Sequence, residues 1–274
     1  MTNVFLDHEM AIRLTCFGAV LAGVAAWELF APRRVLNNSR VTRWPSNLAL
    51  VALNTAVLRV MFPIAAVGMA GVAVERGWGV LNILAVADWL AVLVAIILLD
   101  LAIYTQHVVV HAVPVLWRLH RMHHADLDID VTTGARFHPL EIVLSMAIKL
   151  AVVVVLGAPP LAVMVFEIIL NAAAMFNHGN IRLPVALDRV LRFVIVTPDM
   201  HRVHHSIREN ETNSNYGFNI PWWDRLFGTY RDQPCDGHQG MTIGLDLFRD
   251  KRNLRLDRLL LQPFLDPKNK TSKD

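Results

Sequence analysis

The chain has 274 residues, of which 54% are hydrophobic and only 18% are charged, and its formal net charge is +3. This composition lies beyond the usual range of soluble domains and predicts an integral membrane protein embedded in a lipid bilayer. Its basic residues border apolar runs and form no tract with interleaved aromatic residues, so the charge indicates lipid headgroups, and no nucleic acid is expected as a partner.

Five apolar runs follow one another along the chain: Leu14 to Ala31, Asn47 to Val74, Val80 to Leu99, Ile142 to Leu156, and Leu161 to Phe176. A hydrocarbon core of roughly 30 Å needs about 20 helical residues, so the first three runs predict spanning helices, with the second tilted. The last two runs are short and are joined by Gly157-Ala158-Pro159-Pro160, which predicts a hairpin that either crosses the bilayer and returns or dips in part way. We therefore expect an all-α membrane bundle of about four to five membrane helices. The acidic N-terminus is unlike a cleaved signal peptide, so we expect the first run to remain as an anchor.

Charge asymmetry predicts the orientation of these spans. The loop from Pro32 to Pro45 holds four arginines, whereas the amino-terminal tail carries mainly Asp7 and Glu9, so the positive-inside rule places the loop in the cytoplasm. Counting the spans from there places all histidines from His107 to His205 on the cytoplasmic face. Four charged residues lie at or near membrane depth, where we expect either mutual pairing or a role in shaping a substrate tunnel: Arg59, Asp88, Lys149 and Glu167.

Beyond the hairpin the chain becomes less apolar. Leu187 to Val196 interleaves apolar and charged residues and predicts an amphipathic helix on the membrane surface. Residues 206–240 are rich in Asn, Gly, Pro and aromatic residues, which predicts an ordered cytoplasmic cap with many turns. Leucines between Leu254 and Phe264 predict an interfacial segment, and Asp266 to Asp274 a loose polar tail.

Ten of the twelve histidines fall between His107 and His205, and most recur at helical spacings. Residues at i, i+3 and i+4 share a helix face, so each group can direct its imidazoles at one point. The eight grouped ligands, which suit two metals better than one, are His107 and His111, then His120, His123 and His124, then His201, His204 and His205. His138 and His178 stand alone and are predicted as further ligands, whereas His8 and His238 are expected to be exposed bystanders.

Acidic residues near these groups have alternative interpretations. Asp100 lies seven residues before His107 on the same helical face, where it either accepts an imidazole N–H or is a charge at a helix end. Three acids after His124 are interpreted as solvated turn caps, with anchoring of ligand histidines as the alternative: Asp126, Asp128 and Asp130. Asp199 is the expected N-cap of the helix that carries the last histidine group.

The donor set narrows the metal chemistry. Imidazole suits iron, zinc, copper and nickel, whereas structural zinc sites and iron–sulfur clusters use cysteine, and this chain has only Cys16 and Cys235. The zinc-peptidase motif H-E-x-x-H is absent, because the run that starts at His8-Glu9 lacks the second histidine. A haem site needs single histidines on facing helices, not adjacent pairs such as His123-His124. The spacing favours two non-haem metals in an all-nitrogen shell.

The order of these histidines resembles the fatty acid hydroxylase and sterol desaturase superfamily of membrane di-iron enzymes. Further matching stretches are Arg136-Phe137-His138-Pro139-Leu140-Glu141, Thr197-Pro198-Asp199-Met200, and Trp223-Asp224-Arg225-Leu226-Phe227-Gly228-Thr229-Tyr230. The resemblance covers residues 100–230 and implies a catalytic domain at 100–240 that includes the membrane hairpin at 142–176. Residues 1–99 would then be N-terminal transmembrane helices, and 241–274 an interfacial helix and tail.

The resemblance also implies an activity. Members bind two irons, for which zinc can substitute during recombinant expression, and use O2 to insert oxygen into, or remove hydrogens from, unactivated C–H bonds of lipids. Each turnover needs two electrons from an external ferredoxin, cytochrome or reductase, because His138-Pro139 is followed by Leu140-Glu141 and not by the Gly-Gly of a fused cytochrome b5 haem motif. Hydroxylation is preferred to desaturation, while the lipid substrate stays open. The alternative is a non-catalytic membrane protein that binds or transports metal.

Overall fold

The computed structural model describes residues 2–265, so the tail expected at Asp266 to Asp274 lies outside the described residues. Helices make up the ordered framework of this part of the chain, whose β features are two isolated bridges. The elements of the first two thirds are α1 (Thr2–Asp7), α2 (Glu9–Phe30), α3 (Arg40–Met61), α4 (Ala66–Glu75), α5 (Val80–Ile83), α6 (Asp88–Ala112), α7 (Pro114–His124), a 3₁₀ turn η1 (Thr133–Ala135), α8 (Pro139–Leu156) and α9 (Pro160–Asn177).

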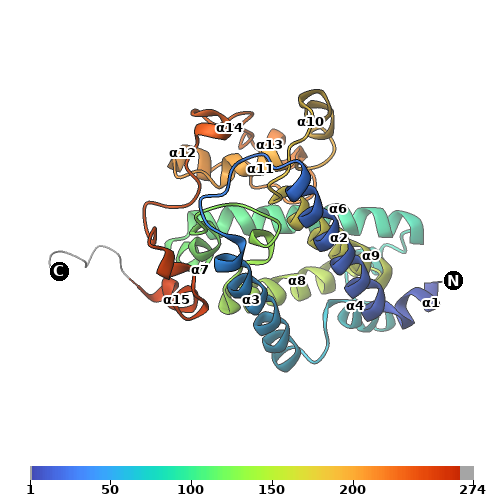
Figure 1. Ribbon diagram of the computed structural model, residues 1–274. Helices are drawn as coiled ribbons and strands as arrows, with labels where there is room; N and C mark the ends of the chain where they lie inside the picture. The colour runs from blue at the N-terminus through green and yellow to red at the C-terminus, as the bar shows by residue number, and fades with distance from the viewer. Residues whose placement is uncertain (1, 266–274) are drawn as a thin grey trace.

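Five segments within the described residues are long and apolar enough to cross a membrane: Glu9–Phe30, Arg40–Ile83, Asp88–Ala112, Pro139–Leu156 and Pro160–Asn177. The expected all-α membrane bundle is therefore confirmed. The shorter elements α10 (Val185–Leu191), α11 (Pro198–His204), α12 (Glu209–Thr212), α13 (Trp222–Leu226) and α14 (Gly237–Gly240) form the cap, followed by η2 (Lys251–Leu254), α15 (Leu256–Leu261) and η3 (Gln262–Phe264). Figure 1 shows the cap elements α10 to α14 gathered on one side of α6.

Two of the predicted runs have different boundaries in the structure. The run from Asn47 to Val74 is not one tilted helix, because it breaks between α3 and α4 around Pro63, which has no backbone N–H to donate. The third span begins at Asp88 and not at Val80, and it continues well past Leu99. Its buried face includes Leu99, Tyr104 and His107, so the packing stripe carries the helix directly into the first histidine pair.

The hairpin between α8 and α9 turns at Gly157, which has a left-handed φ of +67°. Gly79 also has a positive φ, and a Cβ added to it would lie 2.0 Å from the backbone nitrogen of Gly157. This contact joins the loop after α4 to the hairpin turn at one end of the bundle. In the adjoining core, buried small residues such as Ala70, Ala95 and Ala162 let α4, α6 and α9 pack closely.

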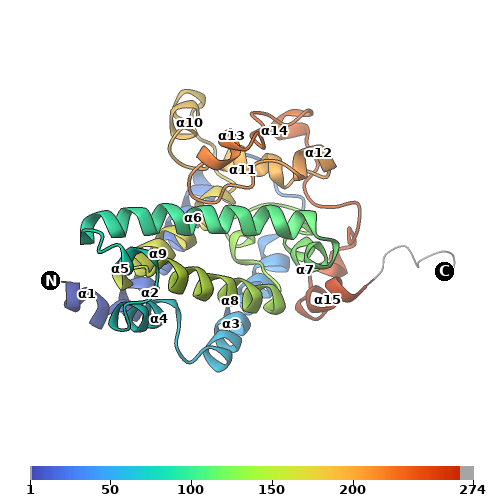
Figure 2. The ribbon, with the colours of Figure 1, turned by 180° about the vertical axis from the view of Figure 1, so that it is seen from behind.

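The other end of the bundle brings the histidine-bearing segments together. The end of α2 and the segment after α9 are joined by two backbone hydrogen bonds, from Arg182 N to Ala31 O (2.8 Å) and from Arg33 N to Asn180 O (3.0 Å). Figures 1 and 2 show α7 and the carboxyl end of α6 on the opposite side of the molecule from the N-terminus. The helix ends that carry ligands therefore meet at one end of the bundle, as the span count requires.

The amphipathic helix expected at Leu187 to Val196 is shorter in the structure, since α10 ends at Leu191 and turns follow. Its apolar side chains, including Val190, Phe193 and Val194, are exposed. Asp188 is buried and accepts hydrogen bonds from Arg192. Its buried polar groups therefore pack against the rest of the cap, where Arg192 also contacts Tyr230, and its apolar side chains face outward.

Candidate metal centre

The site is built from four segments. His107 and His111 lie near the end of α6, three histidines lie on α7, His178 caps the end of α9, and the last three lie on or directly after α11. Helix α7 starts with Pro114 at its first position, where the missing N–H has no consequence. Helix α11 also starts with a proline, and its N-cap is Thr197, whose hydroxyl accepts from Met200 N at 3.4 Å.

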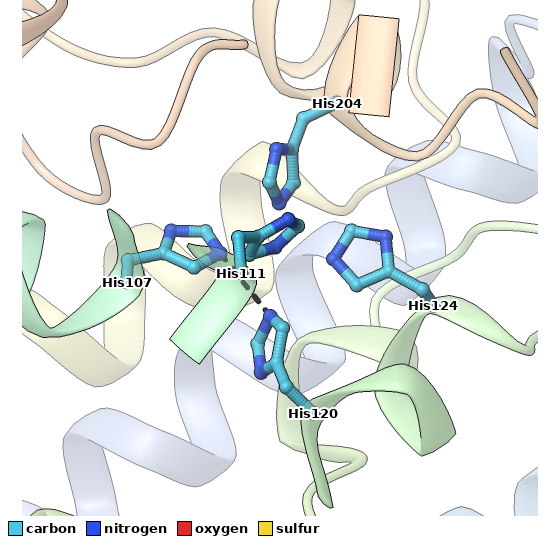
Figure 3. Close-up of side chains that lie close together, drawn as sticks. All are labelled: His107, His111, His120, His124 and His204. Carbon is cyan, nitrogen blue, oxygen red and sulfur yellow. Dashed lines mark hydrogen bonds between the residues drawn. The ribbon is translucent and has the colours of Figure 1, made fainter. Parts of the chain in front are cut away.

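The histidines form two groups of ring nitrogens, and within each group these atoms lie within 4.8 Å of one another. In the described part of the chain, the first group is His107, His111, His120, His124 and His204, and the second is His123, His178, His201 and His205. Figure 3 shows the rings of the first group directed toward a common centre from several elements. The groups are neighbours, because the ring centroids of His124 and His205 are 4.6 Å apart.

Hydrogen bonds fix the orientation of most rings. His107 Nδ1 lies 2.7 Å from Tyr216 O, and His204 Nδ1 lies 2.7 Å from Ser214 O. The Nδ1 atoms of the following rings also face acceptor oxygens: His111 faces Asn213 Oδ1 (3.3 Å), His120 faces Glu141 Oε1 (2.6 Å), His123 faces Arg136 O (3.2 Å), and His178 faces Ala174 O (2.7 Å). Oxygen acceptors select the tautomer with hydrogen on Nδ1, which leaves a lone pair on Nε2.

These lone pairs converge without donors to satisfy them. His178 Nε2 lies 3.1 Å from Nε2 of each of His123, His201 and His205. In the other group, buried Nε2 atoms of His111, His124 and His204 have no hydrogen-bond partner within residues 2–265. Buried nitrogen lone pairs directed at one another are unfavourable unless a cation lies between them. The donor set therefore fits two bound metal ions.

Burial keeps these ligands neutral. Desolvation, followed by the neighbouring imidazoles, lowers the pKa of His123, His124, His201 and His204 well below 6.5. The pKa of His178 falls to about 4, also mainly through burial. A neutral imidazole is the form that binds metal, so the site can take up metal at neutral pH without first losing a proton from its rings.

The lone histidines have different surroundings. His138 lies outside both groups: as N-cap of α8 its Nδ1 accepts from Leu140 N at 3.2 Å, and its Nε2 lies 3.3 Å from Leu260 O. His8 is exposed, as expected. The expectation of exposure was wrong for His238, which is 5% exposed and has Nε2 3.5 Å from Asp199 Oδ2.

Asp199 and Asp100 have roles that the sequence did not predict. Asp199 lies inside the first turn of α11, while Thr197 is the cap, and its carboxylate accepts from Arg33 Nε at 3.0 Å and from Arg202. Asp100 is in the middle of α6, so it is not a charge at a helix end, and no imidazole contacts it. It accepts from Asn219 Nδ2 (2.6 Å) and Trp223 Nε1 (2.8 Å), which attaches the cap to α6.

The acids that follow α7 are buried, so the solvation expected for them was wrong, although Asp130 does cap its turn by accepting from Thr132 N at 3.0 Å. Arg43 of α3 donates to both carboxylate oxygens of Asp126 at 2.8 and 2.7 Å and to Asp130 at 2.6 Å. Asp128 accepts from the backbone nitrogens of Asn37 (3.0 Å) and Asn38 (2.8 Å). Burial opposes ionisation of Asp126, but Arg43 and Arg136 outweigh it and hold its pKa below the usual range. These bonds fasten the ligand-bearing α7 to the start of α3.

Glu141 contacts a ligand histidine, a role that the sequence did not predict. It lies three residues after His138 in the first turn of α8, and its Oε1 is 2.6 Å from His120 Nδ1. A carboxylate on the far nitrogen of a ligand fixes the ring and strengthens its donor nitrogen. In the sequence, the only indication of this role was a glutamate three residues after His138, in the first turn of a predicted helix.

A cavity of about 320 Å³ adjoins the centre on its membrane side, and its lining includes His107, His120 and Glu141. Side chains from α2, α3, α6, α8 and α9 form its other walls. The predicted pairing of charges inside the bundle is confirmed for Lys149 and Glu167, whose side chains are 2.7 Å apart at this cavity. Arg59 instead contacts Met10 Sδ, and Asp88 begins α6.

A family model described as fatty acid hydroxylase matches residues 92–229, which span all the grouped histidines. The chain belongs to this family. Among similar proteins, the ornithine lipid hydroxylase OlsE of Rhizobium tropici is 29% identical over 143 residues, covering 52% of this chain and 42% of that protein.

Two further relatives are more distant. The alkylglycerol monooxygenase of Homo sapiens is 24% identical over 154 residues, covering 54% of this chain and 32% of that protein. The cholesterol 25-hydroxylase of Mus musculus is 25% identical over 144 residues, with 52% and 47% covered. The match thus spans less than half the length of each of these relatives. No solved structure matches the chain.

Proposed function

We propose that this protein is a membrane-bound non-haem di-iron oxygenase that hydroxylates a C–H bond of a lipid. The observation that carries the proposal is the convergence of nine histidines, in two adjacent groups, with Nε2 lone pairs facing one another. Each turnover would consume O2, two electrons and two protons and release the hydroxylated lipid and water. Bound iron would supply the activation of O2 that an unactivated C–H bond requires.

The two groups would hold one iron each. The first iron would take His107, His111, His120, His124 and His204, and the second His123, His178, His201 and His205. This set retains His178 from the predicted ligands and leaves out His138, which bonds within α8 and to the C-terminal segment. Zinc is an alternative occupant in recombinant material, because imidazole donors bind both metals.

The protein's own residues would orient the ligands and admit the substrate. Glu141 holds His120, and backbone carbonyls such as Tyr216 O and Ser214 O hold rings of the same group. These contacts come from α8 and the cap, so the centre is pre-organised by elements far apart in sequence. The adjoining cavity reaches into the membrane helices, which provides a route for a substrate dissolved in the bilayer.

Several finer points belong to the same proposal. The printed names of the relatives describe them as hydroxylases or monooxygenases of lipids, which supports a lipid substrate and favours hydroxylation over desaturation. The four arginines of the loop from Pro32 to Pro45 support a cytoplasmic active site, within reach of a ferredoxin, cytochrome or reductase that donates electrons. A metal transporter would line its ligands along a path through the bilayer, whereas these cluster at one end of the bundle.

The test combines metal analysis with lipid analysis. Purified protein should contain up to two irons per chain, and cells that express it should gain a lipid heavier by one oxygen when grown in air. His123→Ala should abolish that product, while His8→Ala, at an exposed histidine outside both groups, should leave it unchanged. An O2-independent product, or an His123→Ala variant with unchanged product, would contradict the proposal.

A further inference from the structure

The cavity beside the metal centre has a largely apolar lining that is interrupted by several polar side chains. Its lining includes charged or amide side chains from five helices: Arg13, Asn54, Gln106, Glu141, Lys149 and Glu167. Such groups at membrane depth are costly and usually face a functional interior when they are present. They give part of the cavity wall the capacity to hydrogen-bond a polar part of a lipid.

Three of these side chains have a buried acceptor oxygen that receives no hydrogen bond from residues 2–265. Asn54 Oδ1, Gln106 Oε1 and Glu141 Oε2 are buried atoms without a hydrogen-bond partner. The other ends of two of them are occupied, since Asn54 Nδ2 donates to Phe137 O at 2.9 Å and Glu141 Oε1 contacts His120. Asn54 and Glu141 are 7% and 5% exposed, so bulk water does not hydrate them. These three acceptors therefore need hydrogen-bond donors that the described part of the protein does not supply.

The polar lining extends away from the metal centre along α8. Lys149 lies eight residues after Glu141 on this helix, which places it about 12 Å further along the helix axis. There Glu167 contacts Lys149 Nζ at 2.7 Å and Arg13 at 3.1 Å. Arg13 also pairs with Glu9 at 2.6 Å, so two acidic and two basic side chains balance here. The distal end therefore offers hydrogen bonds to a neutral or zwitterionic group and has no surplus charge that would select an anion.

The cavity has an opening between α2 and α3. Arg13 of α2 is 32% exposed, and Thr55 of α3 is exposed, yet both line the cavity. On one side of this opening Trp44 packs against α2, and on the other Arg59 contacts Met10 Sδ at 3.7 Å. Figure 1 shows α2 and α3 apart from each other, with α8 in the space between them. A hydrocarbon chain can leave the cavity here and remain in the bilayer.

We propose that this cavity binds the polar, hydrogen-bond-donating headgroup region of an amphipathic lipid, whose hydrocarbon chain extends between α2 and α3 into the bilayer. The position of oxidation rests on the proposed function. Because the headgroup region would lie against His107 and His120, oxygen would be added to the headgroup or to carbons next to it. Hydroxyl, amide or ammonium N–H and O–H groups of the lipid would satisfy the three acceptors.

A binding experiment tests the cavity without turnover. Purified protein in detergent micelles is titrated with 1-monopalmitoylglycerol, which has two hydroxyl donors, and with its 2,3-dimethyl ether, which has none. We expect the diol to bind about tenfold more tightly, since leaving a buried acceptor unpaired weakens binding by this order. Equal affinity of the two probes for the wild-type protein would overturn the proposal, and that comparison requires no variant.

A variant pair locates the preference. Gln106→Leu removes the unpaired acceptor, and Thr105→Val is its control on the same helix, because Thr105 is exposed and its hydroxyl bonds Leu101 O of its own helix. Gln106→Leu removes one of the three acceptors and should reduce the preference for the diol, whereas Thr105→Val should keep it. Thermal unfolding of both variants identifies a folding defect. A folded Gln106→Leu variant with undiminished preference would place the headgroup elsewhere and overturn the assignment.

Lipid analysis separates this inference from the proposed function. Tandem mass spectrometry of lipids from expressing cells assigns the added oxygen to the headgroup, its adjacent carbons or the distal chain. Oxygen on the distal chain would overturn the headgroup placement and leave the oxygenase intact. Absence of any oxygenated lipid, together with a preserved diol preference, would contradict the oxygenase and support the binding site.

Discussion

Glu141 is predicted to control the affinity of only one of the two metal ions proposed for this site. Its carboxylate lies 2.6 Å from His120 Nδ1, and His120 belongs to the first histidine group alone. Removing an acidic partner of a ligand histidine weakens metal binding by about 10- to 100-fold. At about 1.4 kcal/mol per tenfold change, Glu141→Ala should weaken this ion by about 1.4 to 2.7 kcal/mol. The ion proposed for the second group should keep its affinity, because its ligands His123 and His178 keep their contacts to Arg136 O and Ala174 O.

The assay is a chelator titration of metal-loaded protein in micelles, with the ions that remain bound counted after gel filtration. Wild-type protein should lose its ions over a narrow range of chelator, whereas Glu141→Ala should lose one ion at a chelator activity 10- to 100-fold lower. Glu141→Gln keeps an acceptor oxygen and should fall between them. Glu75→Ala, at an exposed residue at the end of α4, is the control and should match wild type. Equal weakening of both ions, or none, would refute the assignment of His120 to a separate group.

Three further predictions concern stability. Arg43→Met removes the guanidinium that pairs with two buried carboxylates and should destabilise the fold by about 3–5 kcal/mol, seen as a large drop in thermal midpoint, whereas the exposed Arg252→Met should change it little. Gly79→Ala places a Cβ 2.0 Å from backbone and should lower the midpoint and expression, unlike Gly18→Ala, whose Cβ meets nothing within 4 Å; equal midpoints would refute the close packing. Burial lowers the pKa of His238 from 6.5 to about 4, so the unfolded chain binds a proton more readily and stability should fall as pH drops from 6.5 to 4. His238→Asn should show a shallower fall across that window, and an unchanged pH profile would contradict the burial.

The membrane helices and the ligand groups could be predicted from sequence because both are local patterns. A run such as Pro160–Asn177 is apolar enough to identify a span, and spacing within one helix fixes which imidazoles share a face, as for His120, His123 and His124 on α7. The break at Pro63 was also readable from local chemistry. It was missed because hydropathy continues through the break while the helix does not.

Contacts between distant segments could not be predicted in this way. The sequence gives no reason for Arg43 to reach Asp126, 83 residues away, so those acids were interpreted as solvated caps when they form a buried network. Likewise the sorting of adjacent His123 and His124 into different groups depends on the direction of each ring at the end of α7.

The chain by itself determined that apolar helices would hold histidines in sets able to bind metal, because composition and helical periodicity act over a few turns. Tertiary structure alone decided that His178 joins a group and His138 does not, although both are lone histidines at helix ends. It also decided that Asn54, Gln106 and Glu141 face one cavity. These outcomes depend on how α3, α6, α8 and α9 pack, and packing is set by side chains far apart in the sequence.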